Sequence, residues 1–376
     1  MIPFNKPHLT GKETHYMYDA VSTGKISGNG KYTKMCQEFF EKQYGFEKCL
    51  LTTSCTDALE MAALLINIEP GDEVIMPSYT FVSTSNAFIL RGATIIFADS
   101  ETDNPNLDAS KIEALITPKT KAIVPVHYAG VACDMDTIMA LAEKYNLFVV
   151  EDAAQAIDSF YTGKDGVKRA LGSIGHLAAF SFHETKNIIS GEGGMLAIND
   201  RQFADRAEII WEKGTNRSSF FRGEVDKYGW VDMGSSFLPS EIISAFLWAQ
   251  LEELEDIQNK RKHIWQLYYD ALQDWALATN VKLPVVPEYA TNNAHMFYLV
   301  CPDLARRTEL INKLKAADIW CVFHYLSLHK SPFYTDKHYG ATLAQSDHYS
   351  DCLVRLPFYY DLSDADIQKI TDCIKQ

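Results

Sequence analysis

Short apolar runs alternate with amphipathic stretches along the first two hundred residues of the chain. The runs are mostly rich in Val, Ile and Phe, which is typical of buried strands, and they lie at 73–77, 94–98, 121–126, 147–150, 177–182 and 195–198. Helical patterns at 56–66 and 134–145 lie between these runs; the first follows the polar Ser54 and the second opens with acidic residues. This alternation predicts an α/β fold with a mainly parallel central sheet and helices on both faces.

The pattern changes after about residue 240. A long helical stretch extends from 239 to 269, and a proline-containing passage follows it. Beyond that lie a strand pattern at 296–300, a helix pattern at 305–316 and a second strand pattern at 320–325. We therefore expect two domains, a large one over 1–240 and a smaller C-terminal α+β domain over 241–376 that begins with the long connecting helix.

Charge, apolar runs and cysteine spacing argue against several classes of protein. Acidic residues outnumber basic ones by 49 to 35, giving a net charge of −14, which argues against a nucleic-acid-binding protein or one that docks on anionic lipid. No apolar stretch approaches the roughly 20 residues that span a bilayer, so the expected location is the cytoplasm. The cysteines form no C-x-x-C pair and the C-terminal histidines no compact ligand pattern, so we expect no metal site.

Polar side chains follow several of the predicted strands, at the sheet edge where open α/β folds bind ligands. Asp152 follows the apolar run 147–150 after Glu151, and Lys186 follows the run 177–182. Taken singly, the aspartate could be a helix cap or an ion-pair partner and the lysine a surface charge. Taken together they match a pyridoxal 5′-phosphate (PLP) site, where a lysine forms a Schiff base and an aspartate pairs with the pyridine nitrogen. A desolvated Lys186 could also carry the proton away from the substrate Cα.

A phosphate group would find small polar residues at the start of the helix pattern 56–66. Ser54, Cys55 and Thr56 lie at that position, where backbone N–H groups and the helix dipole favour an anion. An ordinary helix cap explains the same residues equally well. Ser181 could add a hydroxyl group, and Phe81 or Tyr79 could stack on the pyridine ring.

Four of these segments together resemble the DegT/DnrJ/EryC1/StrS sugar aminotransferases, and the similarity extends over essentially the whole chain. They are 77–81 (PSYTF), 126–130 (VHYAG), 151–155 (EDAAQ) and 180–186 (FSFHETK). The resemblance implies a fold-type I PLP enzyme that acts as a homodimer, with each active site completed by the partner subunit. It implies that Lys186 binds the cofactor covalently, Asp152 pairs with the ring nitrogen, Gln155 contacts the ring hydroxyl and Phe81 stacks on the ring.

The same resemblance implies that Ser181, Cys55 and Thr56 hold the phosphate, together with a residue of the partner subunit. Family members commonly supply an Asn for this contact from a Gly-x-Asn segment; here Gly234-Ser235-Ser236 stands in its place, so Ser236 would substitute for it. For the nucleotide-sugar, polar residues near the small domain are the candidates, each with an alternative role in packing or at the surface. These candidates are Arg217, His324, Tyr325 and His329.

The resemblance also implies a reaction. An amino group would move from L-glutamate to C4 of dTDP-4-keto-6-deoxy-D-glucose, giving 2-oxoglutarate and dTDP-4-amino-4,6-dideoxy-D-galactose, as in the enterobacterial common antigen branch of the family. Pyridoxamine 5′-phosphate (PMP) would be the intermediate form of the cofactor. One alternative is that the product is the gluco epimer at C4. The other is that the substrate is a different nucleotide-linked keto sugar.

Two further alternatives change the kind of function. A PMP-dependent sugar dehydratase would carry histidine where this chain has Lys186, and a non-enzymatic PLP-binding regulator would carry an added DNA-binding domain, usually with a basic patch. The sequence therefore favours amino transfer over both.

Overall fold

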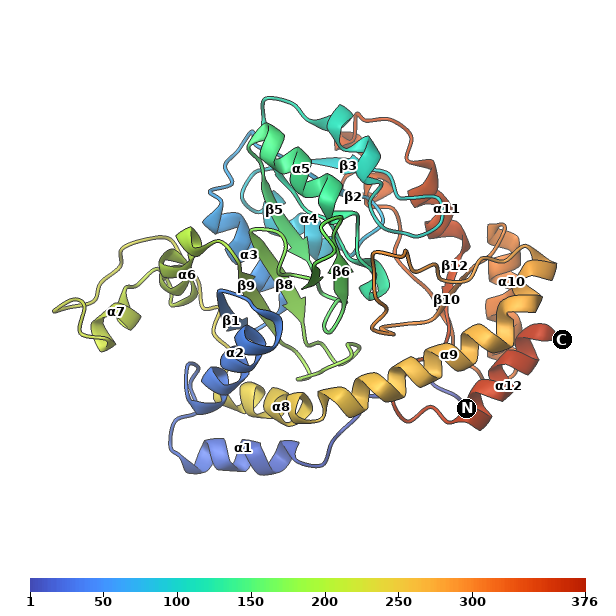
Figure 1. Ribbon diagram of the computed structural model, residues 1–376, viewed down its shortest axis with the longest axis horizontal. Coiled ribbons are helices and arrows are strands. Elements are labelled where there is room, and N and C mark those ends of the chain that lie inside the picture. Colours follow the sequence, from blue (N-terminus) through green and yellow to red (C-terminus); the bar gives the residue numbers. More distant parts are fainter.

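A seven-stranded sheet forms the centre of the protein in the computed structural model, which describes residues 1–376 (Figure 1). In spatial order its strands are β1 (Lys48–Thr52), β9 (Gly194–Ile198), β8 (Leu177–Ser181), β5 (Phe148–Asp152), β4 (Thr120–Ile123), β2 (Glu73–Pro77) and β3 (Thr94–Ala98). Only β9 runs antiparallel to its two neighbours. The expected mainly parallel sheet is therefore confirmed, and β2 and β3 have the expected bounds.

Both faces of the sheet are covered by helices because its strands are apolar on both faces. Val149 packs into one core and the next residue, Val150, into the other, as the period of two in a strand requires. One face is covered by α3 (Cys55–Leu65), α4 (Val82–Ile89) and α6 (Ala204–Trp211), and the other by α2 (Lys31–Tyr44), α5 (Met135–Tyr145) and α8 (Glu241–Glu252). Helix α1 (Glu13–Ser22) packs on α8, and β6 (Phe160–Thr162) pairs with β7 (Lys168–Ala170) in a separate hairpin.

A smaller sheet of three antiparallel strands lies at the C-terminal end of the chain. Its order is β10 (Tyr298–Val300), β12 (Leu353–Arg355) and β11 (Val322–Phe323). Around it lie α9 (Leu254–Thr279), α10 (Leu304–Ala316), α11 (Ala344–Cys352) and α12 (Asp364–Lys375). The single helix expected over 239–269 is two helices instead, because the backbone leaves helical geometry at Glu253 (φ −111°, ψ 16°) between α8 and α9.

The hydrophobic cores of the two domains include residues from both sides of residue 240. Leu247, Leu251 and Ile257 pack into the core of the large sheet, although they follow residue 240. Ile2, at the other end of the chain, packs into the core of the small domain and pairs with Ile319. The division at 240 and 241 stays a prediction, but α8 packs with the large domain.

None of the helices has the length and apolar character needed to span a bilayer. The cytoplasmic location stays a prediction.

Candidate active site

A cavity of about 1020 Å³ lies between the carboxyl edge of the large sheet and the small domain. Strand β5 contributes Asp152, β8 contributes Ser181 and the segment after β8 contributes Lys186. These strands are parallel, so their carboxyl ends meet at one edge, as the sequence predicts. The opposite wall comes from the small domain and includes His324, Tyr325 and Arg355.

The amine of Lys186 faces this cavity without a hydrogen bond or ion pair. The surrounding protein removes water from it and lowers its pKa from the usual 10.5. Asp152 opposes this shift, since its negative charge favours the ammonium form. The result is an amine that loses its proton more readily than a surface lysine, which suits a nucleophile or a base.

The carboxylate of Asp152 is buried at the end of β5. Thr84 Oγ1 donates to its Oδ2 at 2.7 Å, and the backbone N–H of Ala154 donates to its Oδ1 at 3.1 Å. Burial raises the pKa of this carboxyl, while the two hydrogen bonds and the charge of Lys186 oppose the rise. The oxygens have a fixed direction toward the cavity and capacity for one more donor.

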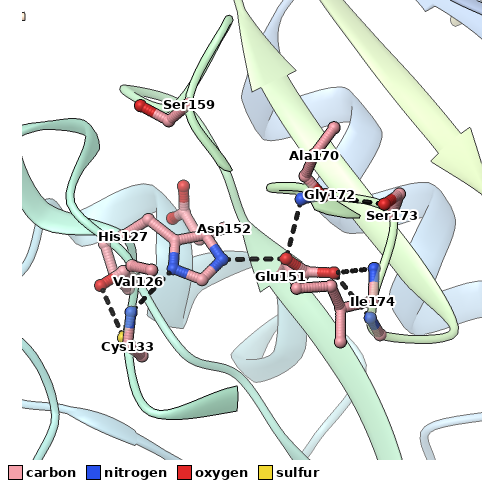
Figure 2. A network of polar contacts seen from close by, with 12 residues as sticks. Val126, His127, Cys133, Glu151, Asp152, Ser159, Ala170, Gly172, Ser173 and Ile174 are labelled. Carbon is pink, nitrogen blue, oxygen red and sulfur yellow. Dashed lines mark hydrogen bonds and ion pairs between the residues drawn. The ribbon is translucent and has the colours of Figure 1, made fainter. Parts of the chain in front are cut away.

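Glu151, the preceding residue, has its own buried network of contacts (Figure 2). His127 Nε2 donates to its carboxylate at 2.8 Å, and His127 Nδ1 accepts the N–H of Cys133, which assigns the ring proton to Nε2. Backbone N–H groups also donate to Glu151, from Gly172, Ile174 and Gly175. These contacts tie β5 to the turn before β8 and to the residues after β4, so they hold the strand end that carries Asp152.

The N-terminus of α3 lines the cavity, at the position where the sequence predicts a phosphate site. The Ser54 side chain accepts the N–H of Asp57 at 3.1 Å and leaves the N–H groups of Cys55 and Thr56 without an intrahelical acceptor. Gly194 lies so close to Ser54 and Cys55 that a Cβ at that position would overlap their backbone atoms. Burial raises the pKa of Cys55 well above its usual range, so its thiol stays neutral and does not repel an anion.

Gln155, Tyr325 and Phe81 lie together on the other side of the cavity. Gln155 accepts the N–H of Ala129 through Oε1 at 2.6 Å and donates from Nε2 to the Tyr325 hydroxyl at 2.9 Å. The Phe81 ring lies 6.1 Å from the Tyr325 ring and is 56% exposed, so one of its faces is free to stack.

His324 lies on the small-domain wall with its ring stacked on Tyr325 at 3.6 Å. Its Nδ1 lies 2.6 Å from the Tyr128 hydroxyl, and burial holds its pKa well below the usual value, so the ring is neutral. His329 has a different environment: its Nδ1 lies 2.8 Å from Ser78 Oγ, and its side chain does not line the cavity.

Besides His329, two of the residues expected at the site do not reach the cavity within one chain. Arg217 is exposed at the start of α7 (Arg217–Phe221) and packs over the Phe221 ring. Ser236 is exposed and pairs with Glu212. Figure 1 shows α7 projecting from the side of the large sheet that is farthest from the small domain.

The structure also brings in three residues that the sequence did not indicate: Thr84, His295 and Arg355. His295 is buried against Asn187, and burial lowers its pKa well below the usual value. The sequence contains one indication of Arg355, because this charged residue interrupts the apolar run from Leu353 to Pro357. No three His, Cys, Asp or Glu side chains come together in a group that could hold a metal ion.

Comparisons with known proteins show which family the chain resembles over its length. The model of the DegT/DnrJ/EryC1/StrS aminotransferase family matches residues 7–375. The spore coat polysaccharide biosynthesis protein SpsC of Bacillus subtilis is 32% identical over 388 residues, covering 100% of this chain and 96% of SpsC. The aminotransferase TlmJ of Streptoalloteichus hindustanus superposes with a TM-score of 0.90 at 26% identity, covering 100% of this chain and 98% of TlmJ. The PLP form of Spr1654 from Streptococcus pneumoniae superposes with a TM-score of 0.89 at 25% identity, covering 100% and 97% of the two chains.

Proposed function

The chain belongs to the DegT/DnrJ/EryC1/StrS aminotransferase family, and we propose that within it the enzyme transfers the amino group of L-glutamate to C4 of dTDP-4-keto-6-deoxy-D-glucose. The products would be 2-oxoglutarate and dTDP-4-amino-4,6-dideoxy-D-galactose, the sugar of the enterobacterial common antigen branch. The observation that carries the proposal is that the Lys186 amine and the buried Asp152 carboxylate line the same cavity of about 1020 Å³.

The enzyme is a PLP-dependent sugar aminotransferase, and the residues of the cavity fit this cofactor. Lys186 would bind its aldehyde carbon, and Asp152 would accept a hydrogen bond from its protonated pyridine nitrogen. The α3 N-terminus, with Ser54, Cys55, Thr56 and Ser181, would hold its phosphate. Phe81 would stack on the ring, and Gln155 would contact the ring hydroxyl.

When bound, PLP supplies the electron sink that makes breaking a Cα–H bond feasible. The chain's residues supply the rest of the reaction. Asp152, whose carboxylate is fixed by Thr84 and Ala154, would keep the ring nitrogen protonated. The Lys186 amine would carry the proton from the donor Cα to C4′ of the cofactor, and in the second half-reaction it would carry a proton from C4′ to C4 of the sugar.

The size of the cavity supports a substrate larger than an amino acid. About 1020 Å³ is at the upper end of the range of ordinary small-molecule sites, so a nucleotide-linked sugar can be accommodated beside the cofactor. The name of the relative SpsC places that protein in polysaccharide biosynthesis, a use that also fits an amino sugar made here. His324 and Tyr325 line the substrate side and would contact the sugar.

The decisive experiment is to incubate the purified enzyme with L-glutamate and dTDP-4-keto-6-deoxy-D-glucose and determine the product by NMR. An axial amine at C4 is the expected result. An equatorial amine would identify the gluco epimer as the product, and the absence of any amino sugar with this substrate would overturn the proposal.

We also propose that the enzyme is a homodimer in which the segment around α7 contacts the partner subunit. This segment exposes Phe221 (69%), Trp230 (84%) and Met233 (51%), an unusual density of large apolar side chains for a solvated loop. The contact would bring Ser236 to the partner's phosphate site, and Arg217 lies in the same segment. Light scattering should give the mass of two chains for the wild type and of one chain for Trp230→Glu; a wild-type monomer would overturn the proposal.

A further inference from the structure

Arg355 is the last residue of β12, the central strand of the small sheet, and it is the only arginine that lines the cavity. Its guanidinium lies over the Phe4 ring, with 4.8 Å between Cζ and the ring centroid. Its Nε is buried and has no hydrogen-bond partner, and the side chain makes no ion pair. A cation with unused donors therefore faces the interior of the active site.

Apart from the Lys186 amine, two other cations near the cavity have partners. Lys330 Nζ lies 2.6 Å from Asp347 Oδ2, and Arg261 donates to the carbonyl oxygens of Ala294 and His295. Desolvating a guanidinium without any partner costs free energy, and a bound anion would offset this cost. The five N–H groups of arginine form a planar fork that matches the two oxygens of a carboxylate. The open position beside Arg355 is therefore an anion site.

The neighbours of Arg355 indicate which anion it receives. Arg355, Lys186 and His324 line the same cavity, and the charge of Arg355 contributes to lowering the pKa of the other two. In an amino acid, the carboxylate is attached to the carbon that carries the exchanged amine. In a nucleotide-sugar, the diphosphate is several bonds away from C4. A cation close to Lys186 therefore suits the carboxylate better than the diphosphate.

We propose that Arg355 binds the α-carboxylate of the amino-acid donor and thereby orients its Cα–H bond toward Lys186. This inference rests on the proposed function in one respect, namely that the donor is an α-amino acid. Phe4 packs against the guanidinium, and Lys186 lines the same cavity from the large domain.

The donor half-reaction tests this role separately from the sugar. Arg355→Gln, mixed with L-glutamate, should convert the cofactor to its amine form with kcat/KM lowered about 100-fold, because a charged bidentate contact is lost. The conversion is followed by the absorbance of the enzyme-bound cofactor. Arg355→Lys should recover only part of the loss, since lysine keeps the charge without the fork.

A matched control is Arg307→Gln. Arg307 is also a small-domain arginine that stacks on a phenylalanine and has a buried, unpartnered Nε, but it does not line the cavity. Its substitution should leave the donor half-reaction unchanged, and the melting temperature of each variant reports any loss of folding.

The comparison of two donors removes the remaining ambiguity. The wild type should prefer L-glutamate over 4-aminobutyrate, which lacks the α-carboxylate but keeps the distal one, and Arg355→Gln should lose this preference. An unchanged preference would overturn the inference. So would a variant that reacts normally with L-glutamate but is impaired with the keto sugar, because Arg355 would then bind the diphosphate. If the wild type reacts with L-glutamate but not with that sugar, the proposed substrate fails and the role of Arg355 stands.

Discussion

The two walls of the cavity differ in how their polar groups are held. On the large-domain wall, Asp152 lies at a strand end whose register the sheet sets, and two donors fix its oxygens. On the small-domain wall, the Arg355 guanidinium packs on an aromatic ring and makes no hydrogen bond. The first wall is complete before any ligand arrives, which suits a cofactor that stays through both half-reactions. The second wall has unused donors, which suits substrates that enter and leave.

This comparison makes a general prediction. Substitutions on the large-domain wall should impair the donor and the sugar half-reactions together, whereas substitutions on the small-domain wall should impair one of them. Measuring both half-reactions for every variant therefore tests whether the two walls differ in this way.

The largest effect is expected for Lys186→Ala. Turnover should fall about 10⁴-fold or more, because the covalent attachment and the proton carrier are lost together. In the wild type, borohydride should abolish the visible absorption band of the cofactor and leave a permanent adduct on the chain. A borohydride-trapped adduct in Lys186→Ala would show that another residue binds the cofactor.

Asp152→Asn should retain the cofactor but lose about 100- to 1000-fold of the rate in both half-reactions, since the charge that keeps the ring nitrogen protonated is removed. Absorbance gives the cofactor content and stopped-flow mixing gives the two rates. A rate close to that of the wild type would exclude the proposed electrostatic role.

Thr84→Val should lower both half-reactions about tenfold. The substitution keeps the side-chain shape but removes the 2.7 Å hydrogen bond to Asp152, and a hydrogen bond to a charged group contributes on that scale. An effect confined to one half-reaction would contradict the view that this wall serves both.

The pH at which half of the apoenzyme binds PLP should shift in opposite directions when a residue of one wall or of the other is substituted. The apoenzyme binds PLP through the neutral amine, so loading should rise with pH and reach half its maximum below 10.5, since burial lowers the pKa of Lys186. Asp152 favours the ammonium form, so Asp152→Asn should move the midpoint lower. Arg355 disfavours that form, so Arg355→Gln should move the midpoint higher. Shifts in the same direction would contradict this electrostatic arrangement.

The smallest effect is expected for Tyr325→Phe. The substitution removes the acceptor of the Gln155 amide, a neutral hydrogen bond, and should lower the rate about threefold. The cofactor spectrum should be unchanged. A loss as large as that of Asp152→Asn would place Tyr325 in the proton transfer itself.

The large-domain wall could be predicted from the sequence because its determinants are local. An apolar run followed by a polar residue indicates a strand end, and parallel strands bring their ends together, so the sequence alone is enough to pair Asp152 with Lys186. The role of Thr84 could not be predicted in this way, because its contact with Asp152 joins α4 to β5 and depends on how that helix packs.

The small-domain wall was harder to predict because it consists of loops and a short strand. His324 and Tyr325 lie in the cavity, but His329, only a few residues further along the chain, turns toward Ser78 instead. No spacing in the sequence distinguishes these orientations. Arg217 and Ser236 belong to a segment whose role is proposed to lie in the partner subunit, and a single sequence does not show where a second chain sits.

The first residues of the chain acquire a practical meaning from the contact between Phe4 and Arg355. The matched family region begins at residue 7, yet Ile2 is buried against the small domain and Phe4 lines the active-site cavity. An affinity tag or a trimmed start at this end would therefore disturb the ring that supports Arg355, the group proposed to bind the donor carboxylate. Kinetic work on this enzyme is better done with the tag at the other terminus, where Gln376 is exposed to solvent.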